Sequence, residues 1–380
     1  MIKPLKYKSI NWINGMKLSS DHFTVSDLYL QDFVRDAVSI HLNNSNYGFL
    51  PPFTGYKSSH DIEIIEKATN HIEIRVRYCN AVTPEGCHID IVQSDHMMDT
   101  LVHNHYFGQS EPRNYVILLV VSPFNRIPTG TPNPEESPIR YPELTKSYSI
   151  AVLPESEVST QTADSYFLTI GQVYYENGRL TINNNYIPPS ATITSHPALI
   201  RYYESFSVLL NDLQLAAFKI IDKTGGRDNI TPLGKNIRLI SEKIVDYIAG
   251  LFYEYRNIAH RESPAVLVGY FSSLAHIFFT AIKLIDPRER EELLKYFYEW
   301  KDVTPGNFEE LLAKTIELVY DHKQINNSML MASEFMNVLV ALWNKLSGLE
   351  YIGQRKENIV VAEQQVVQQV QARKTWTLLD

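Results

Sequence analysis

The stretch YIPPSATITSHP, residues 186–197, separates two parts of the sequence that have different hydrophobic patterns. Before it, apolar and polar residues alternate, which is the period-two pattern of half-buried β-strands. After it, apolar residues recur every three or four positions, as they do on one face of an α-helix. The sequence therefore predicts an α+β protein, with a β-rich domain over residues 1–190 followed by a helical bundle over residues 191–350.

Several segments predict the antiparallel strands of the first domain. HIEIRVRYC, residues 71–79, and CHIDIV, residues 87–92, alternate in polarity around the turn sequence TPEG. The apolar run YVILLVV predicts a strand that is buried on both faces and stops at Pro123. Asn177-Gly178 predicts a type I′ hairpin turn. The prolines between residues 128 and 142 predict an extended surface loop, and the whole pattern indicates a sandwich-like domain.

One helix interrupts the β-rich domain, from about Asp21 to Leu42, and begins at a serine or aspartate cap. Its apolar residues form an approximate stripe, of the kind that a surface helix turns toward the core. They are Phe23, Leu30, Phe33, Val34, Ala37 and Val38. The stretch before it, NWINGMKLSSDHF at residues 11–23, is predicted to be a loop, a cap and a helix start with buried aromatic anchors.

The second domain is predicted from helical stripes that begin near Leu199, Ile237 and Pro264 and from two further segments, residues 306–321 and 328–346. The helix from Val266 to Ile285 is apolar around most of its circumference, whereas a lone four-helix bundle buries only one stripe per helix. We therefore expect the bundle to be the oligomerising unit. The residues expected at the contact are Phe271, Leu274 and Phe278.

Composition restricts the class of protein. Hydrophobic residues make up 44% of the 380 and charged residues 21%, as in ordinary folded proteins. The formal charge is −8, and the 35 lysines and arginines are scattered, which argues against nucleic acid as a partner. No apolar leader and no run of about 18 apolar residues is present, so we expect a cytoplasmic protein without direct membrane insertion.

The sequence contains no recognisable motif for a chemical site. Two cysteines and four histidines between residues 79 and 105 suggest a metal site, but their spacing matches no metal motif. They are Cys79, Cys87, His88, His96, His103 and His105. No serine lies in a nucleophile elbow and neither cysteine has a catalytic signature. His22 follows the predicted helix cap and is expected to donate to the backbone or to pack. We predict no catalytic, metal-binding or cofactor-binding residues.

Two motifs resemble the TssK family of type VI secretion baseplate subunits. Residues 11–23 are similar to the pattern W-x-x-G-M-x-L-x-x-x-H-F that opens this family. The matching residues are Trp12, Gly15, Met16, Leu18, His22 and Phe23. Asn14 and Ser20-Asp21 depart from the residues often found there. The segment LTIGQVYYENGRLTINNNYIPPS resembles the strand pair of the family, which ends in a hydrophobic-Ile-Pro-Pro element. The matching residues are Gly171, Gly178, Leu180, Tyr186, Ile187, Pro188 and Pro189. SHPALIRYYESF resembles its entry into a helical neck.

The resemblance implies a shoulder domain like that of phage receptor-binding proteins, a helical neck and a homotrimer. It also implies that shoulders dock on the TssF and TssG wedge subunits, while a head domain meets a membrane-complex protein at the inner face of the cell envelope. After the predicted bundle, residues 351–380 are too few for such a head. We expect this tail to make the envelope-side contact through Trp376 and Leu378.

The sequence supports a non-enzymatic baseplate adaptor as the leading function. The alternative is a carbohydrate- or ligand-binding module that uses some of the 23 tyrosines and 16 phenylalanines. A third hypothesis, an unrecognised hydrolase, is supported by the loop histidines alone. For residues 11–23, internal packing is favoured over direct contact with the wedge, since Trp and Met serve both cores and interfaces.

Overall fold

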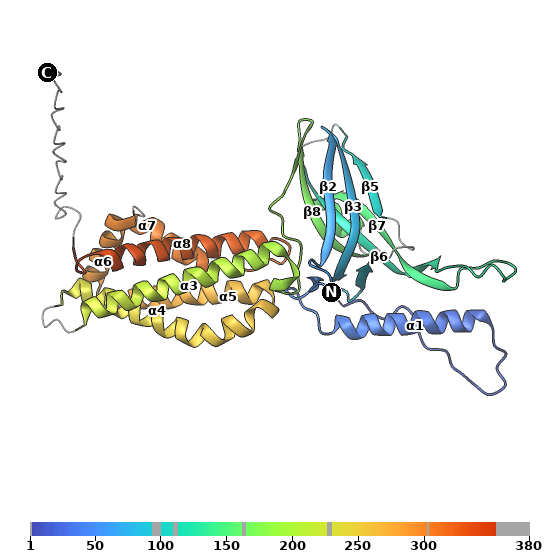
Figure 1. Cartoon of the computed structure of the whole chain (residues 1–380), viewed down its shortest axis with the longest axis horizontal. Helices are drawn as coiled ribbons and strands as arrows, with labels where there is room; N and C mark the ends of the chain where they lie inside the picture. The colour runs from blue at the N-terminus through green and yellow to red at the C-terminus, as the bar shows by residue number, and fades with distance from the viewer. Residues whose placement is uncertain are drawn as a thin grey trace, which may run out of the picture.

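A computed structural model describes residues 2–92, 100–108, 113–161, 165–225, 230–301 and 304–354. The β-rich part and the helical part lie end to end along the long axis of the molecule, and a separate helix runs below the β-sheets (Figure 1). Antiparallel strands come first and the helical bundle second, so the predicted α+β class is confirmed.

Two antiparallel sheets face each other in the β-rich part. The first contains β1 (Gly48–Phe49), β2 (His60–Ala68), β3 (His71–Val82), β4 (His88–Ile91) and β5 (Leu101–Tyr106), with β3 pairing with each of the other four strands. The second has the order β7-β6-β8-β9, with β6 at Arg113–Thr129, β7 at Glu143–Pro154, β8 at Tyr166–Glu176 and β9 at Arg179–Ile182. Their inner faces share one core, in which Ile74 and Ile117 are fully buried.

The predicted hairpins are confirmed, and one strand is longer than predicted. β3 and β4 pair across the TPEG turn. Asn177 and Gly178 have φ angles of 50° and 77°, as a type I′ turn requires. The prediction that the strand stops at Pro123 is wrong, because β6 continues to Thr129. The register of the β6–β7 pairing shifts between Ser122 and Arg126. Pro123 lies in this bulge, where no hydrogen bond between the strands requires the N–H that proline lacks.

Six α-helices lie within the described residues of the second part, one more than predicted. They are α3 (Pro197–Thr224), α4 (Pro232–Asn257), α5 (Pro264–Lys283), α6 (Pro287–Lys301), α7 (Pro305–Ile316) and α8 (Ile325–Gly348). Five begin with proline, which suits the first helical position because no N–H is needed there. The helix that the sequence reading missed is α6, whose first turns, PREREE, are highly charged. Its apolar residues follow only later, at Leu293, Phe297 and Trp300.

The chain passes from the sandwich to the bundle through the Ile187-Pro188-Pro189 element. All three residues are buried, and Ile187 packs into the bundle core. The carbonyl of Pro189 accepts a hydrogen bond of 2.8 Å from the N–H of Phe49 in β1. Gly48 has a φ of 105°, and a Cβ there would lie 1.9 Å from the Pro189 oxygen. The element is therefore part of an internal junction and offers no surface to a partner.

Side chains from distant parts of the sequence complete this junction. The rings of Phe49, His60 and His196 form one stacked cluster, in which the centroid of His60 lies 4.3 Å from that of Phe49 and 5.2 Å from that of His196. His322, in the loop between α7 and α8, accepts a hydrogen bond from the Tyr320 hydroxyl at Nδ1 and donates from Nε2 to the carbonyl of Tyr47 at 2.8 Å. The sandwich and the bundle are thus bound together by buried aromatic and imidazole groups.

The stacked histidines predict a stability that depends on pH. Burial lowers the pKa of His60 from 6.5 to about 4, and burial together with the neighbouring His60 lowers the pKa of His196 to about 3. Between these values and 6.5 the unfolded chain binds protons that the folded chain does not. The stabilising contribution of the two neutral imidazoles is therefore complete above about pH 6.5 and is lost as the pH falls toward about 4 for His60 and about 3 for His196. Urea titrations across this window should show a declining free energy of unfolding.

The control for this prediction is His60→Phe, which keeps a ring in contact with Phe49 and His196 but removes one titrating group. Carboxylates elsewhere also destabilise proteins in acid, so the comparison of the two slopes isolates the histidine. We expect the free energy of unfolding of the variant to depend less steeply on pH than that of the wild type. An unchanged slope would show that His60 is not protonated on unfolding in this window.

Candidate interaction surfaces

Among the described residues, no group of three or more His, Cys, Asp or Glu side chains is placed to hold a metal ion. Cys79 and Cys87 are free and buried, and burial raises the pKa of both thiols, that of Cys87 to about 12. His88 hydrogen-bonds to Asn80 at 3.0 Å. His96 lies outside the described residues. Of the described histidines, His88 lies on β4, and His103 and His105 lie on β5, so the expectation that they are loop histidines is wrong.

The N-terminal motif lies on the surface, and the expectation that it packs internally is wrong. Trp12 is 50% exposed, and Leu18 and Phe23 are each 57% exposed. Gly15 adopts a φ of 80° in a tight turn closed by the Met16 N–H. His22 has a structural role, because its Nδ1 accepts the N–H of Ser19, the cap of helix α1 (Ser20–Ser39). The motif therefore combines a fixed backbone with exposed apolar side chains.

Helix α1 is held to the sandwich by a polar face. Asp32 and Arg35 are 0% and 3% exposed, and their side chains pair at 2.8 Å. Arg35 also donates to the carbonyls of Glu85 and Lys3, and Asp32 accepts the backbone N–H groups of Lys6 and Tyr7. A buried ion pair is tolerated where hydrogen bonds satisfy its remaining groups, as they do here. This polar face fixes the orientation of the helix.

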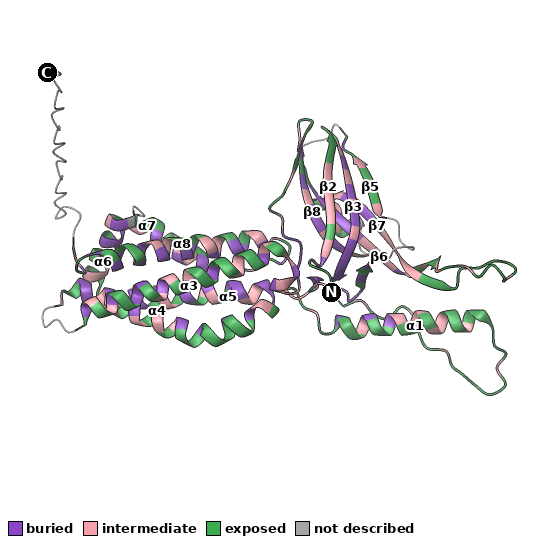
Figure 2. Cartoon of the chain, in the orientation of Figure 1, coloured by how far each residue is buried: buried purple, intermediate pink, exposed green. Residues whose placement is uncertain are grey.

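The opposite face of α1 is apolar and exposed, which corrects the prediction that its stripe faces a core. The exposed fractions are 55% for Leu30, 51% for Phe33 and 61% for Val34. Exposed and intermediate residues run along the helix in Figure 2. Monomeric soluble proteins rarely leave a continuous apolar face in water, so such a face indicates a contact with another molecule.

The three residues that were predicted to form the contact between copies of the bundle are instead buried in the core of a single chain. Phe271, Leu274 and Phe278 are each 0% exposed. They lie on α5, which packs among the five other helices of the described bundle, and Phe271 lies 4.2 Å from Phe206 of α3 between ring centroids. Among the described residues, α5 is also the one helix long and apolar enough to cross a membrane, with a mean hydropathy of 1.8. Its buried side chains show how a core helix meets the same criteria.

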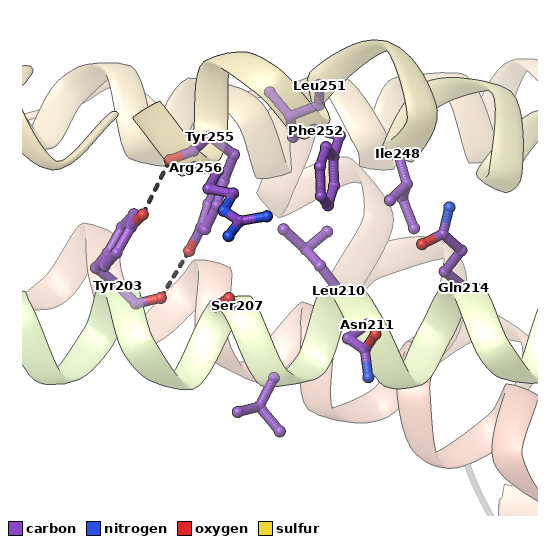
Figure 3. A pocket seen from close by; sticks show the side chains of 11 residues that line it. Tyr203, Ser207, Leu210, Asn211, Gln214, Ile248, Leu251, Phe252, Tyr255 and Arg256 are labelled. Carbon is purple, nitrogen blue, oxygen red and sulfur yellow. Dashed lines mark hydrogen bonds between the residues drawn. The ribbon is translucent and has the colours of Figure 1, made fainter. Parts of the chain in front are cut away.

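A groove of about 450 Å³ lies between α3 and α4 (Figure 3). At one end, Tyr203 and Tyr255 donate hydrogen bonds to each other's backbone carbonyls, at 3.0 and 2.7 Å, and their rings stack. Val208 and Phe252, which also line it, are 60% and 57% exposed. Val208 and Phe252, to which the sequence assigned no role, are thus exposed apolar residues that line a concave surface of the bundle.

The tail residues Trp376 and Leu378 lie outside the described residues, so the structure leaves their expected contact as a prediction. The described sites therefore comprise three surfaces: the N-terminal motif, the outer face of α1 and the α3–α4 groove. The first two adjoin on one helix, and none contains a cluster of groups suited to acid-base or nucleophilic chemistry.

The architecture, a two-sheet β-sandwich followed by a helical bundle, is that of TssK. The crystal structure of TssK matches with a TM-score of 0.52 and 15% sequence identity, covering 87% of this chain and 68% of that one. The baseplate complex from the type VI secretion system matches with a TM-score of 0.49 and 13% identity, covering 88% and 99%. The TssK-TssF-TssG baseplate subcomplex matches with a TM-score of 0.46 and 11% identity, covering 88% and 99%. No protein-family model and no curated protein sequence matches.

Proposed function

We propose that this chain is a non-enzymatic structural component of a type VI secretion baseplate. Three copies form an adaptor between the TssF and TssG wedge subunits and a membrane-anchored complex, in the cytoplasm at the inner face of the envelope. The observation that carries the proposal is a TssK-like fold over 87% of the chain, at a sequence identity of 15%. The exposure of the residues that match the TssK pattern agrees with it.

The wedge contact is assigned to the N-terminal motif. Trp12, Leu18 and Phe23 present large apolar side chains from a backbone that the Gly15 turn and the Ser19 cap hold in place. Partly exposed aromatic groups on a rigid backbone are typical of interface centres, because little conformational entropy is lost on binding. The contact between copies in the bundle is assigned to the α3–α4 surface, and the contact with the membrane-side protein to residues 351–380.

Leu18→Glu should weaken binding to the wedge at least about tenfold, which corresponds to about 1.4 kcal/mol. The charge would have to be buried without a partner when the motif docks. The measurement is co-purification, followed by titration, of the chain with TssF and TssG. The matched control is Val102→Glu, since Val102 is 46% exposed on β5, away from the motif. Equal binding by the two variants would remove the motif from the wedge contact.

A further inference from the structure

A cavity of about 200 Å³ lies where one side of the sandwich meets the start of the bundle. Ile62 and Ile64 of β2 and Ile182, at the end of β9, line it together with His196, the cap of α3. Among the described strands, β2 pairs only with β3 and β9 only with β8. The cavity therefore lies between the edges of two sheets. Most of its lining comes from residues 168–190, the segment that is similar to the TssK strand pair.

The size and the lining of this cavity restrict what it can hold. Apolar cavities of about 150 Å³ in proteins bind benzene, so about 200 Å³ has room for one six-membered ring with a small substituent. Isoleucine side chains from β2, β8 and β9 provide apolar walls, and no Asp, Glu, Lys or Arg lines the cavity. A charged ligand would lose its hydration there without gaining a partner of opposite charge. The lining thus favours a small and uncharged molecule.

The hydrogen bonds of two lining histidines define their tautomers. The Ser59 hydroxyl donates its single hydrogen to the carbonyl of Ser195, so its contact of 3.2 Å with Nδ1 of His60 requires an N–H at that nitrogen. Nδ1 of His196 instead accepts the N–H of Ala198 at 3.2 Å. Burial lowers the pKa of His60 to about 4 and that of His196 to about 3, so both rings are neutral at pH 7 and carry one hydrogen. Nε2 is therefore an acceptor in His60 and a donor in His196.

These two Nε2 atoms are available to a ligand. Neither has a hydrogen-bond partner in the part of the chain that the structure describes, and both remain accessible to solvent. The rings lie 5.2 Å apart between centroids, with 12° between their planes. A neighbouring donor and acceptor match a primary carboxamide, whose oxygen accepts a hydrogen bond and whose N–H donates one. A carboxylate has no hydrogen to donate to His60, and a hydrocarbon satisfies neither nitrogen.

We propose that this cavity binds a small uncharged molecule with an apolar ring and a primary carboxamide. The amide bonds to His60 and His196, and the ring lies among the isoleucines. The inference is independent of the proposed baseplate role, because neither the N-terminal motif nor the α3–α4 groove contributes a residue to the cavity. Since the lining comes from the sandwich and from the cap of α3, a bound ligand would add contacts across the junction and stabilise the folded chain.

Saturation-transfer NMR of the full chain with three probes of similar shape tests the ligand class. We expect benzamide to bind, and benzoate and toluene to bind at least about tenfold more weakly. Benzoate keeps the ring but carries a charge and no amide N–H, whereas toluene keeps only the ring. Toluene that bound as tightly as benzamide would show that the histidines contribute nothing, and benzamide that failed to bind would overturn the proposal outright.

Three variants locate the bound molecule. Ile182→Trp should fill the cavity and weaken benzamide binding at least about tenfold. Thr181→Trp is the matched control, because Thr181 is exposed and points to the opposite face of β9. His60→Phe keeps a ring but removes the acceptor, so benzamide should bind at least about fivefold more weakly while toluene is unaffected.

Circular dichroism establishes that each variant is folded before its binding is compared. Equal benzamide binding by Ile182→Trp and Thr181→Trp would place the molecule outside the cavity and overturn the proposal. Co-purification of Ile182→Trp with TssF and TssG separates this inference from the proposed function. A variant that binds the wedge but not benzamide is expected. A wild-type chain that binds the wedge but not benzamide would overturn the cavity alone, and one that binds benzamide but not the wedge would overturn the baseplate role alone.

Discussion

Replacing Phe278 by glutamate is expected to unfold the helical bundle rather than only to separate copies of the chain. Phe278 is 0% exposed and lies among the rings of Phe297, Phe308 and Trp343, at centroid distances of 6.4, 5.7 and 5.2 Å. Removing a buried phenylalanine costs about 3–5 kcal/mol, and an unpaired buried carboxylate costs more. The total approaches the whole stability of a domain, about 5–15 kcal/mol.

Circular dichroism during thermal melting would measure this loss, and two further variants define its cause. His276→Glu places the same charge on an exposed position of α5 and should leave the melting temperature nearly unchanged. Phe278→Leu keeps most of the apolar volume and should cost about 1.5 kcal/mol or less. If Phe278→Glu melted like the wild type but sedimented as a single chain, the residue would belong to a contact between copies after all.

Replacing Gly48 by alanine is expected to break the junction between the sandwich and the bundle. The added Cβ would lie 1.9 Å from the oxygen and 2.1 Å from the carbonyl carbon of Pro189, and the φ of 105° is unfavourable for any residue with a side chain. The hydrogen bond from Phe49 to Pro189 fixes these two backbones at their present separation. We expect a loss of at least about 3 kcal/mol in the free energy of unfolding.

Gly55 provides the control for backbone conformation. It has a φ of 93°, but a Cβ there would meet nothing within 4 Å. Gly55→Ala should therefore show the conformational cost alone, about 1 kcal/mol. Denaturant titrations of both variants, with hydrogen exchange at the amides of Phe49 and Ala191, would separate the cost of the clash with Pro189 from the conformational cost of the positive φ. An equal loss in the two variants would mean that the backbones at the junction can move apart.

The sequence was informative for most of the helices that are buried by their own chain, α6 excepted. The stripes through Phe206 and Leu213 in α3 and through Ile240 and Ile244 in α4 are buried as predicted. Their period reflects contacts made within the chain, which are the contacts that a single sequence encodes most directly. The Asn177-Gly178 hairpin was equally readable, because a positive φ at both residues is a local requirement.

Helix α1 shows where such reading fails. Its period was recognised, but a period shows only that a helix has two different faces and not which one the chain covers. The buried face is set by Asp32 and Arg35, whose hydrogen bonds reach Lys3, Lys6 and Glu85 in distant loops. No local sequence pattern predicts these long-range hydrogen bonds. The residues of the N-terminal motif were wrongly predicted to be buried for the same reason. The sequence alone does not show whether an apolar residue packs in the core of its own chain or against another protein.

The junction between the sandwich and the bundle has a mechanical consequence. The backbone crosses it once, through the Ile187-Pro188-Pro189 element, but noncovalent links join the two sides at several other places. Ser59 donates to Ser195, Ser263 donates to Ser45, and His322 donates to Tyr47. Bending the molecule at this point would require these links to break together. A force applied to one end of the molecule would therefore move the other end as well, because the junction between the two parts would bend little.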